Sequence, residues 1–154
     1  MAVPPSSTQG WIITFTAETW EVASSLDFSV VAFTPAKQRQ ASRIRIGAKL
    51  FPYITDKQCF AGIISTKTLA IDEPSSSPFG SPGRFPIVIK TSKSLILEPS
   101  NLLPVSTLYR ALALFRGHSS DRSRRQVLRS APLQLKSSDI EILMDRLLCS
   151  SEIE

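Results

Sequence analysis

Apolar residues in the first third of the chain fall into short runs that are separated by polar segments. Residues 11–15 (WIITF) are almost all β-branched or aromatic, which predicts a strand. Thr16 is a good N-cap for a helix that ends near Asp27, because its hydroxyl can accept a hydrogen bond from the first turn. Residues 28–34 form a second β-like run, which Pro35 closes.

The middle of the chain continues with one short helix and two strands. The polar segment 37–44 predicts a helix, and residues 49–55 and 58–68 predict strands that can pair as a hairpin. Pro52 lies inside the first of these strands and indicates an edge or a bulge, since proline donates no ladder hydrogen bond. Gly62 lies inside the second and indicates a bulge or a tight bend.

The second half of the chain opens with a segment that favours no regular structure. Residues 72–84 contain three prolines, two glycines and four serines, which predicts a long loop. Two strands are expected over 85–91 and 93–98, and a helix over 107–116. Residues 118–125 are polar and basic, and we expect a loop there.

The last helix has the clearest pattern. Ser138 and Glu141 have the spacing of a capping box. Apolar residues then follow at the i, i+3, i+4, i+7 and i+8 spacing of one helix face, namely Ile140, Leu143, Met144, Leu147 and Leu148.

These elements predict an α+β domain in which about six strands form a mixed or barrel-like sheet beside three or four helices. The chain has 154 residues, the size of one domain, and 42% of them are hydrophobic, which is enough for a core. We expect a flexible tail over residues 1–10, a single domain over 11–149 and a second tail over 150–154.

The positive charge of the chain is concentrated in two clusters. The formal net charge is +5, yet no lysine or arginine precedes Lys37. The first cluster comprises Lys37, Arg39, Arg43, Arg45 and Lys49, and the second comprises Arg110, Arg116, Arg122, Arg124, Arg125 and Arg129. Two such clusters suit a polyanionic partner such as nucleic acid. The alternative is two solvated surfaces without a partner.

Cysteine content and the first ten residues favour an intracellular protein. Cys59 and Cys149 are the only cysteines, too few for a disulfide framework or a zinc site. Residues 1–10 carry neither positive charge nor an apolar run, so we expect no secretory signal or transit peptide. No apolar run is long enough for a membrane helix. We therefore expect a cytoplasmic protein that has no contact with membranes.

The sequence carries few signs of catalysis. His118 is the only histidine, and no Gly-x-Ser-x-Gly elbow accompanies it. No Walker or Gly-x-Gly-x-x-Gly loop is present to hold phosphates. Asp72 and Glu73 are adjacent in an extended segment, where neighbouring side chains point apart and cannot share a metal. We expect no enzymatic activity, no metal and no cofactor, and keep a small hydrolase that uses His118 as a third hypothesis.

Four blocks in order resemble EVE domains, which belong to the PUA-like superfamily and are relatives of the YTH readers of methylated adenine in RNA. They are residues 11–20 (WIITFTAETW), 40–47 (QASRIRIG), 59–64 (CFAGII) and 98–105 (EPSNLLPV). Residues 112–117 and the last helix also resemble the family, so the resemblance extends over residues 11–148.

This resemblance implies a PUA-like pseudo-barrel of five to six mostly antiparallel strands with flanking helices, and no catalysis. It also implies a reader of a modified base in DNA or RNA, in which the base is flipped into an aromatic and polar pocket. Basic residues then hold the neighbouring phosphates, which provides affinity without sequence information. A methylated nucleic acid is the implied partner, while the sequence leaves the oligomeric state open.

The resemblance and the two basic clusters together single out eight binding residues: Phe33, Thr34, Lys37, Gln38, Arg39, Arg43, Arg124 and Arg125. Phe33 and Thr34 end a strand beside the basic segment and are candidates for the pocket, with core packing as the alternative. Gln38 or Gln40 can read a base edge, because a side-chain amide offers both a donor and an acceptor, with a solvated glutamine as the alternative for each. The five basic residues are candidates for phosphates, with Arg39 and Arg43 first among them. Trp20 is a candidate cage wall, but a helix-face tryptophan more often belongs to the core.

The chain departs from the family pattern at four places, one of which is Val31, where some members carry a tryptophan at the end of a strand. Ala48 and Ser65 replace the usual acidic residues, and residues 122–126 (RSRRQ) replace an aromatic or tryptophan-bearing element. A fold can persist after its base pocket is lost. The second hypothesis is therefore a protein-interaction scaffold of the same fold with a degenerate pocket.

Overall fold

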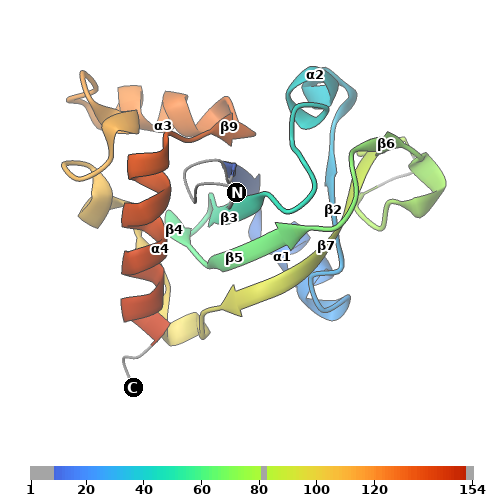
Figure 1. Ribbon diagram of the computed structural model, residues 1–154, viewed down its shortest axis with the longest axis horizontal. Helices are drawn as coiled ribbons and strands as arrows, with labels where there is room; N and C mark the ends of the chain where they lie inside the picture. The colour runs from blue at the N-terminus through green and yellow to red at the C-terminus, as the bar shows by residue number, and fades with distance from the viewer. Residues whose placement is uncertain (1–8, 81–82, 152–154) are drawn as a thin grey trace, which may run out of the picture.

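The computed structural model describes residues 9–80 and 83–151 of the chain (Figure 1). One curled sheet runs through the molecule in the strand order β2-β7-β5-β3-β1-β9, and three two-residue strands extend it. The strands are β1 (Gly10–Phe15), β2 (Val30–Phe33), β3 (Lys49–Ile54), β4 (Cys59–Phe60), β5 (Gly62–Thr66), β6 (Ile71–Asp72), β7 (Ile87–Ile96), β8 (Leu103–Pro104) and β9 (Leu133–Gln134). The only parallel pair among them is β1 with β3. The predicted α+β fold with a barrel-like, mostly antiparallel sheet is confirmed.

Four α-helices flank this sheet, namely α1 (Ala17–Ser25), α2 (Gln38–Ala41), α3 (Asp121–Arg129) and α4 (Ser137–Ser151). In Figure 1, α4 stands at one end of the sheet with α3 and β9 above it, whereas α2 and β6 lie toward the other end. Short 3₁₀ turns connect the rest: η2 (Pro35–Lys37), η3 (Pro74–Ser76), η4 (Pro99–Asn101), η5 (Val105–Leu108) and η6 (Ala113–Phe115).

Side chains on both faces of the sheet are buried, in two separate hydrophobic cores. Because successive side chains of a strand point to opposite faces, Ile12 of β1 joins the core under α4, whereas Trp11 and Ile13 join the core under α1. In β3, Phe51 likewise belongs to the core under α4, and Leu50 belongs to the core under α1. Such burial on both sides explains why these strands read as continuous apolar runs.

The start of α1 confirms the expected cap. The Thr16 hydroxyl accepts a hydrogen bond from the Thr19 amide, and the Thr19 hydroxyl accepts one from the Thr16 amide. Helix α4, in contrast, begins at Ser137, one residue before the predicted cap. Ser138 therefore lies inside its first turn and not at the N-cap.

The helix predicted over residues 107–116 is wrong, because the chain forms η5 and η6 with an extended Leu112 between them. The amides of Ala113 and Leu114 donate to the Asp139 carboxylate of α4 at 2.8 and 3.0 Å. That long-range contact starts a new turn at Ala113, where the local pattern favours a continuous helix.

The loop predicted over residues 118–125 is also wrong. Ser120 accepts a hydrogen bond from the Ser123 amide and starts α3. The apolar residues that α3 buries come late in it, with Leu128 in the core. The basic first turn therefore shows no helical periodicity in the sequence.

The strand expectations need three corrections. Pro52 lies in a central strand and not at an edge, at the point where the antiparallel partner of β3 changes from β5 to β4. The strand expected over 58–68 is divided before Gly62, where an added Cβ atom would lie 2.1 Å from the Leu95 carbonyl oxygen. The two strands expected over 85–98 are one, β7.

The predicted boundary segments also contain regular structure. Gly10 is the first residue of β1, and α4 reaches Ser151, while residues 1–8 and 152–154 lie outside the described residues. The helix expected over 37–44 is limited to η2 and α2. The segment 72–84 contains η3 and includes Phe79, whose side chain is only 4% exposed.

Candidate nucleic-acid interface

Three adjoining cavities meet at Thr14, the one exposed residue of β1. The first, which we call the phenylalanine recess, has a volume of about 160 Å³. Its lining consists of Phe15, Phe79 and Phe85 together with Ala32 and the threonines Thr14, Thr16, Thr19 and Thr55. The recess therefore offers three aromatic rings, several hydroxyl groups and no charged side chain.

A chain of ring contacts connects the recess to the core behind it. Phe28 packs on Trp20 with centroids 4.8 Å apart, and Trp20 packs edge-on against Phe15 at 5.2 Å. Phe15 and Phe85 both contact Phe79, at 6.5 and 6.4 Å. Trp20 thus supports the wall of the recess from behind, as the core alternative anticipated.

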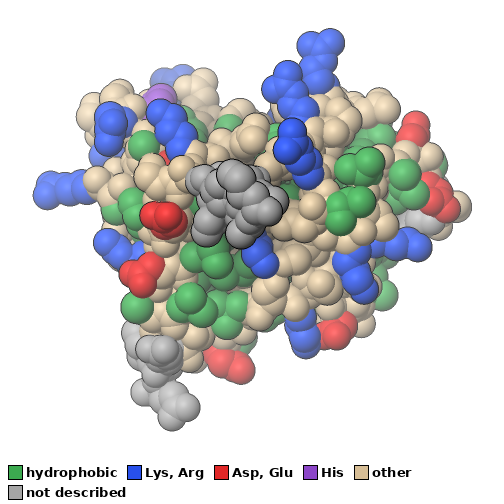
Figure 2. Space-filling model, in the orientation of Figure 1, with side chains coloured by type: hydrophobic (Ala, Val, Ile, Leu, Met, Phe, Trp, Pro, Cys, Tyr) green, Lys and Arg blue, Asp and Glu red, His purple; other side chains and the backbone are tan. Residues whose placement is uncertain are grey.

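The second cavity, the connecting groove, has a volume of about 150 Å³ and runs between the ends of two elements. One wall carries Phe33, Thr34 and Lys37, where β2 passes into η2. The other wall carries Arg129 at the end of α3, followed by Ala131 and Pro132. One residue of each basic cluster, Lys37 and Arg129, therefore lines this groove from opposite walls. Figure 2 shows lysine and arginine side chains over α2 and on the α3 side, with a lower outline between them.

The third cavity, the hairpin pocket, is the largest of the three at about 300 Å³. Its lining consists of Thr14, Tyr53 and Thr55 from the sheet, Gln58 from the turn between β3 and β4, and Arg125, Leu128 and Arg129 from α3. It shares Thr14 and Thr55 with the recess, and Thr14 and Arg129 with the connecting groove. The three cavities form one continuous concave surface.

Charge and protonation make this surface suitable for an anion. Within the described part of the chain, the side chains of Lys37, Arg125 and Arg129 have no ion pair and no hydrogen bond. Burial raises the pKa of Tyr53 to about 12, and Tyr109 and Cys59 act in the same direction while Arg125 opposes them. Tyr53 is therefore a neutral phenol at physiological pH and can donate a hydrogen bond.

The eight predicted binding residues divide into two groups of four. Phe33, Thr34 and Lys37 line the connecting groove, and Arg125 lines the hairpin pocket. Gln38, Arg39, Arg43 and Arg124 line none of the three cavities. The first three of these are exposed on α2 or just after it.

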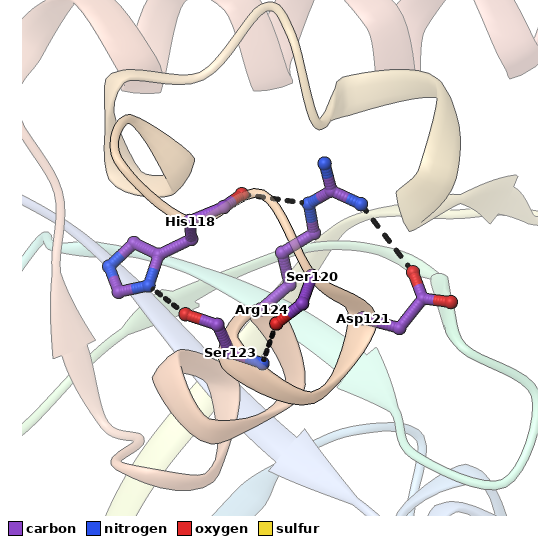
Figure 3. A network of polar contacts seen from close by, with 5 residues as sticks. All are labelled: His118, Ser120, Asp121, Ser123 and Arg124. Carbon is purple, nitrogen blue, oxygen red and sulfur yellow. Dashed lines mark hydrogen bonds and ion pairs between the residues drawn. The ribbon is translucent and has the colours of Figure 1, made fainter.

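Arg124 is held by its own neighbours, as Figure 3 shows. Its Nε donates to the His118 carbonyl at 3.0 Å, and its Nη1 lies 3.4 Å from an Asp121 carboxylate oxygen. Its guanidinium lies 4.3 Å from the centroid of the Tyr109 ring. These contacts fasten the first turn of α3 to the preceding loop and leave Arg124 poorly placed for phosphate.

The same network bears on the hydrolase hypothesis. His118 Nδ1 contacts the Ser123 hydroxyl, whereas the Asp121 carboxylate faces Arg124 instead of the imidazole (Figure 3). A triad needs the carboxylate on the histidine. His118 also lines none of the three cavities.

Several residues of this concave surface were not predicted as binding residues, although some of them are exceptions to the local sequence pattern. Thr14 is the one polar residue of the apolar run 11–15, and Phe79 is the one aromatic residue of the segment 72–84. Each such exception indicates a constraint other than secondary structure. Arg129 belongs to the second basic cluster, but its direction depends on α3, which the sequence did not predict. Gln58 left no signal.

The described residues offer few sites for other chemistry. Between residues 9–80 and 83–151, no group of three or more His, Cys, Asp or Glu side chains is placed to hold a metal. Cys59 is half-buried, and burial raises the pKa of its thiol. Within the same residues, no helix combines the length and apolarity needed to cross a membrane.

Comparison with known proteins gives a clear result for the fold alone. No protein-family model matches the sequence, and no curated protein matches it. Solved structures of YTH domains do match its fold. The Pho92 YTH domain in complex with m6A superposes with a TM-score of 0.66 at 14% identity, over 96% of this chain and 87% of that one.

Two further YTH structures give similar values. The YTH domain of Zygosaccharomyces rouxii MRB1, in complex with N6-methyladenosine RNA, has a TM-score of 0.66 at 12% identity and covers 100% of this chain and 93% of its own. The complex of the YTH domain-containing protein mmi1 with RNA has a TM-score of 0.61 at 10% identity, with coverages of 95% and 87%. The chain thus has a YTH-like fold. The narrower resemblance to EVE domains stays a prediction.

Proposed function

We propose that this chain is an RNA-binding domain that reads a modified base in the phenylalanine recess and holds the flanking phosphates with Lys37 and Arg129. One observation carries the proposal: an uncharged aromatic recess opens directly into a groove whose cations have no partner among the described residues. Three of the YTH structures with this fold are complexes with m6A or with RNA, which supports RNA over DNA.

The recess has the chemistry to hold an extruded base. Unstacking a base costs a few kcal/mol, and stacking on an aromatic side chain returns about 1–3 kcal/mol per base. Phe79 and Phe85 offer such rings, and the surrounding threonine hydroxyls can bond to a base edge. A methyl group on the base gains about 0.8 kcal/mol when it is buried in apolar surroundings. That methyl alone predicts about fourfold discrimination, and contact with the rings raises it toward tenfold.

The phosphate contacts supply affinity that every sequence shares. Lysine and arginine bind phosphate oxygens without reading bases, and this part of the binding weakens as salt rises. In this proposal the groove binds the backbone, the recess reads the base, and no covalent chemistry takes place. The intracellular location expected from the sequence is part of the same proposal.

Fluorescence anisotropy with matched single-stranded RNAs tests the proposal. The RNAs differ only in one central adenine, which is either unmodified or N6-methylated, and the same pair is made in DNA. We expect tighter binding to the methylated RNA by about fivefold to tenfold. Phe85→Leu removes a ring of the recess and should reduce this ratio to below twofold.

Phe115→Leu is the matched control, because Phe115 is buried in the other core and does not line the recess. It should leave the ratio unchanged. Equal and strongly salt-dependent binding to both RNAs contradicts base reading and leaves phosphate contacts alone. No binding by a folded protein removes the nucleic-acid proposal and leaves the protein-interaction scaffold.

A further inference from the structure

The hairpin pocket contains polar groups that the protein itself does not use. Tyr53 is only 3% exposed, yet its hydroxyl has no hydrogen-bond partner among the described residues. The side chains of Gln58, Arg125 and Arg129 line the same pocket and are likewise without a partner in the described part of the chain. No fully buried side-chain polar atom among the described residues lacks a partner, so the unpaired Tyr53 hydroxyl opens into the pocket. A phenol and two guanidinium groups that face one cavity without partners can together bind a ligand that carries hydrogen-bond acceptors.

The position of the pocket limits what this ligand is. The pocket shares Thr14 and Thr55 with the recess, and shares Arg129 with the groove proposed to hold the backbone. A nucleotide strand whose modified base fills the recess therefore extends from there into the hairpin pocket. The pocket, at about 300 Å³, is the larger of the two and can take a second base.

The donors of the pocket outnumber its acceptors. Arginine side chains only donate, while the Tyr53 phenol, the Gln58 amide and the threonine hydroxyls can each donate as well as accept. Guanidinium groups pair best with adjacent acceptors, such as O6 and N7 of guanine. O4 of uracil is an acceptor at the corresponding edge, where adenine and cytosine carry amino donors.

We propose that the hairpin pocket binds the base next to the modified one and selects bases with a carbonyl at this edge, guanine or uracil, over adenine and cytosine. This inference rests on the proposed function and adds sequence context to it. Arg125, which lines this pocket and not the connecting groove, reads the edge together with Tyr53 and Gln58, whereas Arg129 lines both cavities and holds the phosphate.

The backbone conformation of Gln58 allows a substitution that removes the side chain without disturbing the turn. Gln58 adopts a left-handed conformation with φ of +53°, which glycine tolerates without strain. Gln58→Gly therefore removes the amide, keeps the turn and relieves the strain that any Cβ atom bears in this conformation. Tyr53→Phe removes the hydroxyl and keeps the ring that packs on Phe60.

The experiment measures affinity for methylated RNAs in which each neighbour of the modified base is varied among the four bases. We expect guanine or uracil on one side to bind about tenfold more tightly than adenine or cytosine, with little effect on the other side. Gln58→Gly and Tyr53→Phe should each reduce this preference to threefold or less, with methylated over unmodified discrimination intact. Gln126→Ala, on the exposed face of α3 outside the pocket, is the control and should change neither.

The outcomes separate this inference from the proposed function. Discrimination of the methyl group with no preference at either neighbour overturns the hairpin pocket alone. A neighbour preference that survives both variants also overturns it, since other residues then read the base. Loss of methyl discrimination in the unaltered protein overturns the proposed function and this inference together.

Discussion

At the scale of single residues, Asp139 determines more of the local structure than its sequence position suggests. It is a charged residue that is only 2% exposed, and its two carboxylate oxygens accept hydrogen bonds from two successive amides of another segment. The sequence shows it only as an acid near a helix start. Its contact with residues 25 and 26 positions earlier decides where η6 begins.

Replacing Asp139 should therefore destabilise the fold. Asp139→Ala leaves the Ala113 and Leu114 amides without an acceptor, and we expect a loss of about 2–4 kcal/mol in the free energy of unfolding. Asp139→Asn keeps one acceptor and should lose about half as much. Urea denaturation of the three proteins measures this. Equal stability of Asp139→Ala and the unaltered protein contradicts the anchoring role.

Tyr53 gives a residue-scale prediction that depends on pH. Its pKa rises from 10.0 to about 12 in the folded protein, so folding favours the protonated phenol. The contribution of Tyr53 to the free energy of unfolding is fully present below pH 10 and is lost as the pH rises through about 12. We expect the unaltered protein to lose about 2 kcal/mol more stability over this range than Tyr53→Phe.

The chain contains two tyrosines, Tyr53 and Tyr109, so spectroscopy can isolate one of them. In Tyr109→Phe, the phenolate absorbance reports Tyr53 alone and should appear well above pH 10. Normal titration of Tyr53 near pH 10 contradicts the desolvation of this side chain at the hairpin pocket.

At the scale of elements, α3 determines which arginines of the second basic cluster can contact a ligand. The helix turns Arg125 and Arg129 toward the concave surface and Arg124 toward Tyr109 and Asp121. Side chains four residues apart share a helix face, whereas adjacent ones do not. A loop over residues 118–125, as the sequence predicted, leaves Arg124 and Arg125 equivalent.

Substitution of these arginines separates the two roles. Arg129→Ala should weaken RNA binding and lower the slope of log affinity against log salt by about 0.7, the value for one phosphate contact on a single strand. Arg124→Ala should leave that slope unchanged and instead lower stability by up to about 1 kcal/mol, because it loses a partly buried ring contact and ion pair. Anisotropy at several salt concentrations and urea denaturation measure the two effects. A change of slope in Arg124→Ala contradicts this assignment.

At the scale of the whole molecule, the candidate interface is formed where distant segments meet. The recess takes side chains from β1, α1, β2 and the segment before β7, and the hairpin pocket adds the β3–β4 turn and α3. The sheet, with a hydrophobic core on each face, fixes their relative positions. A binding surface of this kind depends on the fold far more than on any motif.

The sequence by itself determined the elements whose signals are local. The apolar run 11–15, the cap at Thr16 and the periodic last helix each contain enough information within a few residues to specify their conformation. The basic clusters likewise follow from composition. Together they are sufficient for the α+β fold class and for a hypothesis about nucleic acid.

The tertiary structure alone decided the features that depend on contacts distant in the sequence. Asp139 divides a predicted helix because its partners lie in another segment. Pro52 is accommodated in a central strand because it lies between the residues of β3 that pair with β5 and those that pair with β4. Phe79 becomes part of a binding surface only because it packs against Phe15 and Phe85. The periodicity of apolar residues indicates which side of a helix or strand is buried, but not which helices and strands pack together. The concave surface at Thr14 is formed by elements that are distant in the sequence, so only the tertiary structure defines it.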